Sequence, residues 1–144
     1  TDTENPQTCG DASGMNCKIS GTIPGLCPDG WHLPNEMEWD TLFTTVGGYE
    51  MADHYKMADK ILKSQRGWDG NHNGTDDFGF SALPAGRYDF NEKSYHWDGS
   101  YAEFWSSTQS DAGAYSIYLE RRDNVLVEYN DFDGFGHSVR CLKD

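Results

Sequence analysis

The chain has 144 residues, a length that fits one domain with a single hydrophobic core. Its net charge of −13 argues against nucleic-acid binding, because so acidic a protein repels phosphate backbones. No membrane insertion is expected, since no apolar run approaches the roughly 20 residues that span a bilayer. Aromatic residues make up 14% of the chain and there are 16 glycines, which favours a loop-rich α+β domain over a helical bundle.

Four cysteines stand in the chain, at Cys9, Cys17, Cys27 and Cys141. Their number is even and none belongs to a CxxC pair, so disulfides in an oxidising compartment are expected rather than a zinc site. Three pairings are possible. We favour Cys9–Cys17 as a local clip in the irregular first 26 residues, and Cys27–Cys141 as a tie between the two ends of the fold. Four reduced cysteines in a cytosolic protein are the alternative.

The first regular element expected is a helix that follows Pro34. Asn35 can cap it and Glu38 lies three residues later, as a capping box requires. One apolar face then follows at helical spacing, formed by Trp39, Leu42, Phe43 and Val46, and Gly47-Gly48 ends the helix. A second, weaker helix is predicted from about Ala52 to Leu62, although residues 61–64 could instead form a short strand.

After a polar loop at residues 67–77, the chain has the character of short strands separated by turns. The candidate strands are residues 102–105, 114–120, 125–130 and 137–142, with a hairpin turn at 121–124 and Cys141 anchoring the last strand. Helices first and antiparallel strands last indicate an α+β fold. On the hairpin, Tyr115, Ile117 and Leu119 are expected to pack inward while Ser116, Tyr118 and Glu120 face out, unless the register is reversed.

Several ordered motifs carry a resemblance to a known family. They are the segment Cys27-Pro28-Asp29-Gly30-Trp31-His32-Leu33-Pro34-Asn35-Glu36-Met37-Glu38-Trp39, then Gly67-Trp68, Asn73-Gly74-Thr75-Asp76, residues 78–86 (FGFSALPAG), Phe104-Trp105-Ser106-Ser107-Thr108 and residues 135–144 (FGHSVRCLKD). Over roughly residues 9–144 the chain resembles the Fibrobacter succinogenes major paralogous domain. The resemblance implies a single C-type-lectin-like domain over residues 1–144, of the formylglycine-generating-enzyme type. Two helices would pack on a small, irregular antiparallel sheet with long loops, in an extracellular or cell-surface setting.

The loop at residues 69–77 is the clearest chemical signal in the sequence. Oxygen-bearing residues recur there at every second position, namely Asp69, Asn71, Asn73, Thr75 and Asp77, and Gly74 stands where a calcium loop turns sharply. The bidentate Glu that usually completes such a loop is replaced by Phe80. The spacing therefore predicts either a weak Ca²⁺ site or a turn whose side chains satisfy its own backbone.

Aromatic and polar residues alternate in the C-terminal half of the chain, a mixture that suits recognition surfaces. Because aliphatic residues are scarce, most of these rings are expected in the core, and Trp31, Trp39 and Trp105 are the strongest core candidates. The candidate ligand-binding residues are Trp97, Tyr118, Tyr129, Asn130 and Asp131. Rings of this kind can stack on sugar faces, and carboxylates and amides can bind hydroxyls.

These residues suggest three classes of function. The favoured one is a non-catalytic extracellular module that binds carbohydrate or protein. A structural subunit of a surface layer or filament is the first alternative. An enzyme of the formylglycine-generating type is the second, but that chemistry needs two reactive cysteines late in the chain and only Cys141 lies there. The sequence offers no candidate catalytic residue, because no nucleophile and base stand out together.

Overall fold

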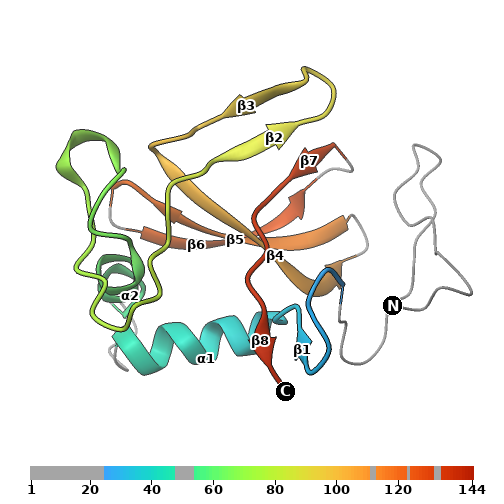
Figure 1. Ribbon diagram of the computed structural model, residues 1–144, viewed down its shortest axis with the longest axis horizontal. Helices are drawn as coiled ribbons and strands as arrows, with labels where there is room; N and C mark the ends of the chain where they lie inside the picture. The colour runs from blue at the N-terminus through green and yellow to red at the C-terminus, as the bar shows by residue number, and fades with distance from the viewer. Residues whose placement is uncertain (1–24, 48–53, 111–112, 123, 132–133) are drawn as a thin grey trace, which may run out of the picture.

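The structure, a computed structural model, describes residues 25–47, 54–110, 113–122, 124–131 and 134–144. Over these residues the chain forms two α-helices and eight strands, which pair in three small antiparallel sheets (Figure 1). This confirms the predicted α+β class. The irregular N-terminal segment predicted for residues 1–26 lies almost wholly outside the described residues. Among the described residues, no helix combines the length and the apolar character needed to cross a bilayer.

The elements follow one another along the chain with the helices first. They are β1 (Trp31–His32), α1 (Glu36–Gly47), α2 (His54–Leu62), a 3-10 turn η1 (Asp69–Asn71), β2 (Arg87–Asp89), β3 (Ser94–His96), β4 (Tyr101–Ser110), β5 (Gly113–Glu120), β6 (Asn124–Asp131), β7 (Phe135–Gly136) and β8 (Leu142–Lys143). The sheets have the strand orders β1-β8, β3-β2-β7 and β4-β5-β6.

Helix α1 begins with the predicted capping box. The side-chain oxygen of Asn35 accepts the N–H of Glu38 at 3.0 Å, and a Glu38 carboxylate oxygen accepts the N–H of Asn35 at 2.9 Å. The apolar face buries Trp39 and Phe43, whose ring centroids lie 5.9 Å apart. The ring of Phe104 on β4 lies 5.6 Å from that of Trp39, so this face fixes α1 against the large sheet.

Helix α2 ends at Leu62, as predicted, and residues 61–64 do not form the alternative strand. Lys63 makes only an isolated bridge with Ala82, directly after the helix. Its ammonium forms a fully buried ion pair with Asp59 one turn back, and it donates to the carbonyl of Glu120 at the end of β5. A buried ammonium is tolerated only when it is paired in this way, so the contact sets where α2 meets the sheet.

Strands β4, β5 and β6 form the largest sheet, and β5 and β6 confirm the hairpin predicted for residues 114–130. Ile117 and Leu119 on β5 are completely buried, as the alternation predicts. The expectation that Ser116 faces solvent is wrong, since it is only 1% exposed. The β2–β3 hairpin folds over this face of the sheet (Figure 1), and residues of the hairpin lie beside Ser116.

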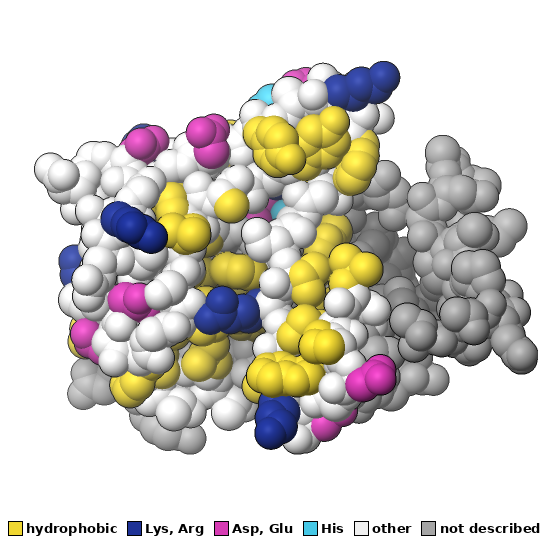
Figure 2. All heavy atoms as spheres, viewed as in Figure 1, with side chains coloured by type: hydrophobic (Ala, Val, Ile, Leu, Met, Phe, Trp, Pro, Cys, Tyr) yellow, Lys and Arg dark blue, Asp and Glu magenta, His cyan; other side chains and the backbone are white. Residues whose placement is uncertain are grey.

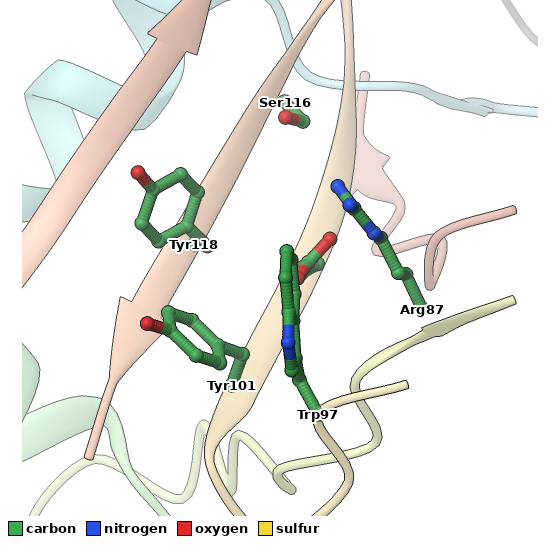
Figure 3. Close-up of a pocket in the computed structure, with 6 residues that line it drawn as sticks. Arg87, Trp97, Tyr101, Ser116 and Tyr118 are labelled. Atoms are coloured by element: carbon green, nitrogen blue, oxygen red, sulfur yellow. The ribbon is translucent and has the colours of Figure 1, made fainter. Parts of the chain in front are cut away.

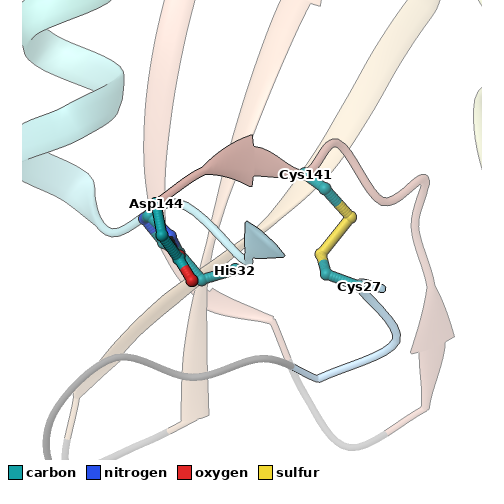
Figure 4. Close-up of a disulfide and its surroundings, with 4 residues drawn as sticks. All are labelled: Cys27, His32, Cys141 and Asp144. Atoms are coloured by element: carbon teal, nitrogen blue, oxygen red, sulfur yellow. Dashed lines mark hydrogen bonds and ion pairs between the residues drawn. A yellow bond between two sulfur atoms is a disulfide. The ribbon is translucent and has the colours of Figure 1, made fainter. Parts of the chain in front are cut away.

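The two ends of the described chain lie together, as predicted. Cys27 and Cys141 form a disulfide with a Cα–Cα distance of 5.7 Å, and next to it Trp31 pairs with Lys143 and His32 with Leu142 (Figure 4). The other predicted bridge, between Cys9 and Cys17, lies outside the described residues. Residues separated by more than a hundred positions are thereby held on one side of the fold.

Two expectations about this end of the molecule are wrong. Trp31 is 39% exposed rather than in the core, because the two-stranded β1-β8 ladder lies at the edge of the fold. The strand predicted for residues 137–142 does not form, because β7 ends at Gly136 and β8 begins only at Leu142, with an isolated bridge between Ser138 and Phe104 in between. Of the other expected core tryptophans, Trp39 is buried and Trp105 is half-buried, while Trp68 is buried without having been predicted.

Candidate ligand-binding pocket

A pocket of about 120 Å³ lies between the β2–β3 hairpin and the large sheet (Figure 3). All of its lining side chains carry either an aromatic ring or a polar group. They are Arg87 from β2, Trp97 from the turn after β3, Tyr101 and Glu103 from β4, and Ser116 and Tyr118 from β5. The pocket is thus built from two separate sheets, which the fold brings together.

The guanidinium of Arg87 is sandwiched between two aromatic rings. Its central carbon lies 4.0 Å from the ring centroid of Trp97 and 3.7 Å from that of Phe135 on β7. Contacts of this kind bind a cation through the negative face of the ring. Stacking therefore holds Arg87 with its positive charge at one wall of the pocket.

A row of aromatic side chains lines the pocket and begins beside Arg87 with Trp97. Trp97 and Tyr101 have ring centroids 5.2 Å apart, and Tyr101 and Tyr118 follow at 5.8 Å in an edge-to-face arrangement. Burial, and then the charge of Glu120 together with a hydrogen bond to it, raise the pKa of Tyr101 above its ordinary value of 10.0. The phenol of Tyr101 is a hydrogen-bond donor already engaged with Glu120.

Glu103 is a buried carboxylate of the pocket lining, only 3% exposed. It forms an ion pair with the imidazole of His137, whose Nδ1 lies 2.9 Å from a carboxylate oxygen. The indole of Trp105 packs edge-to-face on that imidazole at 4.3 Å. The carboxylate of Glu103 therefore has a partner inside the protein.

A glycine sets the position of Trp97. Gly86, just before β2, has a φ of 63°, and a Cβ added there would lie 2.0 Å from the carbonyl oxygen of His96 and 2.8 Å from the carbonyl carbon of Trp97. The N–H of Gly86 donates to the carbonyl of Tyr101 at 2.8 Å. Only a residue without a side chain allows this close approach, so Gly86 joins the hairpin to β4 and brings Trp97 to the pocket.

Two of the predicted ligand-binding residues, Trp97 and Tyr118, meet in this pocket. Tyr129, Asn130 and Asp131 lie on β6, where Tyr129 pairs with Tyr115 of β5, but the positions of their side chains fall outside what the structure describes. Sequence reasoning missed the four other lining residues. Strand alternation could have found two of them, because Ser116 has the parity of Tyr118 and Glu103 alternates with the buried Ala102 and Phe104.

The predicted calcium loop uses several of its oxygens within the chain itself. The side-chain oxygen of Asn73 accepts the N–H of Trp68 at 3.1 Å, and the hydroxyl of Thr75 donates to the carbonyl of Lys60 at 3.4 Å. The carbonyl of Thr75 accepts a hydrogen bond from Gln65 at 2.8 Å. These contacts are those of a turn that satisfies its own backbone, the alternative that the sequence left open.

The remaining side chains of that loop lie at the surface. Asp69, Asn71 and Asp77 are all exposed, and a carboxylate oxygen of Asp69 lies 3.5 Å from the hydroxyl of Ser100. Asn71 has a left-handed backbone with a φ of 64°, which asparagine tolerates better than most residues. Calcium binding at this loop stays a prediction.

A different group of side chains has the spacing of metal ligands. Within the described residues, ligand atoms of Asp89, Glu92 and His96 on the β2–β3 hairpin lie within 4.8 Å of one another. One imidazole and two carboxylates are a donor set that zinc accepts. However, Nε2 of His96 already lies 3.0 Å from Glu92 and 2.9 Å from the hydroxyl of Ser94. The hairpin therefore accounts for the cluster without an ion.

Comparison with known proteins places the chain in a family. No curated protein and no solved structure was found to match it. The model of the Fibrobacter succinogenes major domain matches residues 16–143, which include both helices, every described strand and the whole pocket. The motifs from Cys27 to Asp144 that first suggested this relationship lie in the matched region, apart from the final residue. The chain belongs to the Fibrobacter succinogenes major domain family.

Proposed function

We propose that this protein is a non-catalytic, secreted or cell-surface binding module that recognises carbohydrate or protein through the pocket between the β2–β3 hairpin and β4-β5. The observation that carries the proposal is the lining of that pocket. Rigid aromatic side chains such as Trp97 and Tyr118 stand beside hydrogen-bonding groups such as Ser116, and this combination is typical of recognition sites.

The disulfide supports the extracellular part of the proposal. Cys27 and Cys141 are joined across a sequence separation of 114 residues, and such bridges persist in oxidising compartments. The same disulfide and the β1-β8 pairing hold the two ends of the domain together on one side of the fold. We propose that this closure belongs to a C-type-lectin-like fold, as the family resemblance implies, and that it leaves the β2–β3 hairpin available for a ligand.

The absence of catalysis is part of the proposal. Formylglycine-generating chemistry needs two reactive cysteines, and Cys141 is already in a disulfide. The carboxylate of Glu103 is ion-paired with His137, and the phenol of Tyr101 is engaged with Glu120. Groups with these partners are suited to shaping a site and holding a ligand.

A binding screen with paired variants tests this proposal. The purified domain would be applied to glycan and extracellular-protein arrays, and each hit measured again with Trp97→Ala and with Phe78→Ala. Phe78 is a suitable control because it is 69% exposed and does not line the pocket. We expect Trp97→Ala alone to abolish binding, and any hit to be recovered chemically unchanged. Hits that both variants retain would contradict the pocket assignment.

An exposed aromatic patch favours a second candidate, a structural subunit of a surface assembly. Phe90 and Tyr95 on the β2–β3 hairpin are 60% and 73% exposed, and hydrophobic side chains gather over this hairpin in Figure 2. Exposed apolar patches commonly mark interaction surfaces. Light scattering across protein concentration distinguishes the two candidates, since a subunit would assemble through these residues and Tyr95→Ser would keep it monomeric.

A further inference from the structure

We propose that the pocket binds the carboxylate of a single acidic sugar residue, a uronate, through the guanidinium of Arg87. This inference rests on the proposed function and specifies the ligand of the same pocket. Three properties support it, namely the charge that the pocket presents, the contacts that hold this charge in place, and the size of the space beside it.

Arg87 is the charged side chain that a ligand entering the pocket can reach. Its guanidinium points into the pocket from β2, toward Ser116 (Figure 3), and the residue is half-buried. Glu103, the other charged residue of the lining, is only 3% exposed and is paired with His137. A cation within reach of the ligand, and a carboxylate almost out of its reach, favour a ligand that carries negative charge.

Ring stacking holds the guanidinium and is compatible with an anion at its edge. Trp97 and Phe135 lie against the faces of the group, with ring centroids 4.0 Å and 3.7 Å from its central carbon. The N–H donors of a guanidinium point outward in its plane, in a fork that matches the two oxygens of a carboxylate. Arg87 has a further interaction within the protein, and its five donors are enough to serve both that partner and a ligand. Because two rings already order the side chain, little conformational freedom is lost when the carboxylate binds.

The hydroxyl groups of the lining are less suited to anchor a ligand. Ser116 and Tyr118 both have interactions within the protein, and the phenol of Tyr101 is engaged with Glu120. A ligand that depended on these hydroxyls would have to displace their partners. We therefore expect the contact between carboxylate and guanidinium to supply most of the polar binding energy, and the rings to contact the apolar part of the ligand.

The size of the pocket limits what accompanies the carboxylate. Its volume of about 120 Å³ is that of roughly four water molecules, which admits a carboxylate and the ring edge that carries it. Trp97 belongs to the lining and is 47% exposed, so it continues the pocket to the surface. A pyranose can place a C–H face on such a ring, whereas an acidic amino-acid side chain offers only a short methylene stem. This favours a sugar acid over an acidic peptide.

The charge of the whole protein restricts the ligand further. A net charge of −13 repels long acidic chains. One carboxylate can still be held at Arg87, because the contact acts at short range while the repulsion by distant surface charges is screened by salt. We therefore expect the uronate to stand at the end of an otherwise neutral glycan, and polyuronates to bind poorly.

Paired ligands and paired arginine variants test this inference. Binding of methyl glucuronoside would be compared with that of methyl glucoside, which has the same ring without the carboxylate, by ligand-observed NMR and calorimetry. We expect the glucuronoside to bind at least about tenfold more tightly, because the glucoside cannot form the charged hydrogen bonds. Arg87→Gln should abolish this preference, and Arg87→Lys, which keeps the charge without the fork, should weaken binding about three- to tenfold. Arg66→Gln makes the same change of charge at an exposed residue outside the pocket and should leave binding unchanged.

Loss of the ring contacts could unfold the Arg87→Gln variant, so circular dichroism would report the folding of each variant. The comparison of the two sugars on the unmodified protein does not depend on that variant. A glucoside that bound as tightly as the glucuronoside would overturn the inference, and so would a folded Arg87→Gln variant that kept the preference for the glucuronoside.

The remaining outcomes separate this inference from the function on which it rests. If a short peptide with a single aspartate bound in place of the glucuronoside, the sugar assignment would be overturned and a binding module would remain. Array hits without binding of the glucuronoside would overturn the inference alone. If neither sugar nor the peptide bound and the array screen were also silent, the inference and the proposed function would fail together.

Discussion

The imidazole of His137 and the carboxylate of Glu103 form an ion pair at 2.9 Å, with side chains that are 0% and 4% exposed. A polar group at such depth depends on its partner, because water cannot replace it. We expect Glu103→Gln, which keeps the shape of the side chain, to destabilise the fold by about 1–3 kcal/mol. Urea unfolding of the variant and of the unmodified protein measures the difference.

The β2–β3 hairpin provides a control with the same chemistry. Glu92 and His96 form an ion pair at 3.0 Å, but their side chains are 65% and 37% exposed. An exposed ion pair contributes no more than about 1 kcal/mol to the free energy of unfolding. We therefore expect Glu92→Gln to lower that free energy less than Glu103→Gln does. If the two variants lost equal amounts of unfolding free energy, burial would not determine how much the Glu103–His137 pair contributes to stability.

A second histidine makes stability depend on pH. Nδ1 of His32 lies 2.6 Å from Asp144 and its Nε2 lies 3.0 Å from Glu38. Only the protonated ring can donate from both nitrogens. The hydrogen bond to Asp144 and then that to Glu38 raise the pKa of His32 above 6.5. A histidine whose pKa is raised by folding stabilises fully below its unfolded pKa, and the contribution is lost as pH rises through the folded value.

The test compares His32→Gln with the unmodified protein at two pH values. We expect the difference in Tm between them to be larger at about pH 5.5 than at about pH 9, because the stabilisation by His32 is lost as pH rises through its folded pKa. Because the variant and the unmodified protein are compared at the same pH, the effect of the many titrating carboxylates on Tm cancels. His72→Gln is the control, since His72 is exposed. A Tm difference that is the same at both pH values would contradict the role given to His32.

Local signals explain which parts of the fold the sequence could predict. The capping box of Asn35 and Glu38 and the apolar face of α1 depend only on residues within one or two turns, so they were predicted correctly. The β5-β6 hairpin follows in the same way from alternation on either side of a short turn. In contrast, the exposure of Trp31 depends on which segments pack beside it, and nothing in its neighbours shows that β1 lies at an edge.

The pocket was only partly predictable for a related reason. Trp97 and Tyr118 could be selected as surface aromatics from their composition and parity. The contribution of Arg87 depends on stacking against Trp97 and Phe135, and Phe135 lies 48 positions further along the chain (135 minus 87). Glu103 belongs to the site because His137, from a segment predicted as a regular strand, turns inward to meet it. Contacts between residues so far apart in the chain produce no periodic pattern that a single sequence could reveal.

The disulfide is expected to contribute a large share of the stability. It closes a loop with a sequence separation of 114, for which the chain-entropy model gives about 4–5 kcal/mol. We expect the double variant with Cys27→Ser and Cys141→Ser to unfold at markedly lower urea concentration, and no thiol of Cys27 or Cys141 to titrate in the native protein. Replacing both residues avoids an unpaired thiol. An unchanged urea midpoint would show that β1 and β8 hold the ends together without the bridge.

The loop at residues 69–77 is the place where calcium and the self-supporting turn make opposite predictions. If Ca²⁺ binds with a millimolar Kd, 10 mM calcium should stabilise the fold by about 1.4 kcal/mol and raise Tm by roughly 3–6 °C. Asp77→Asn, which removes an exposed charge from the loop, should abolish that rise. Asn73→Ala separates the two predictions, because it leaves the N–H of Trp68 without its acceptor and should cost about 1 kcal/mol even in chelator. A Tm that stays constant in calcium, with Asn73→Ala still destabilising, would assign the loop to the turn and contradict the calcium site.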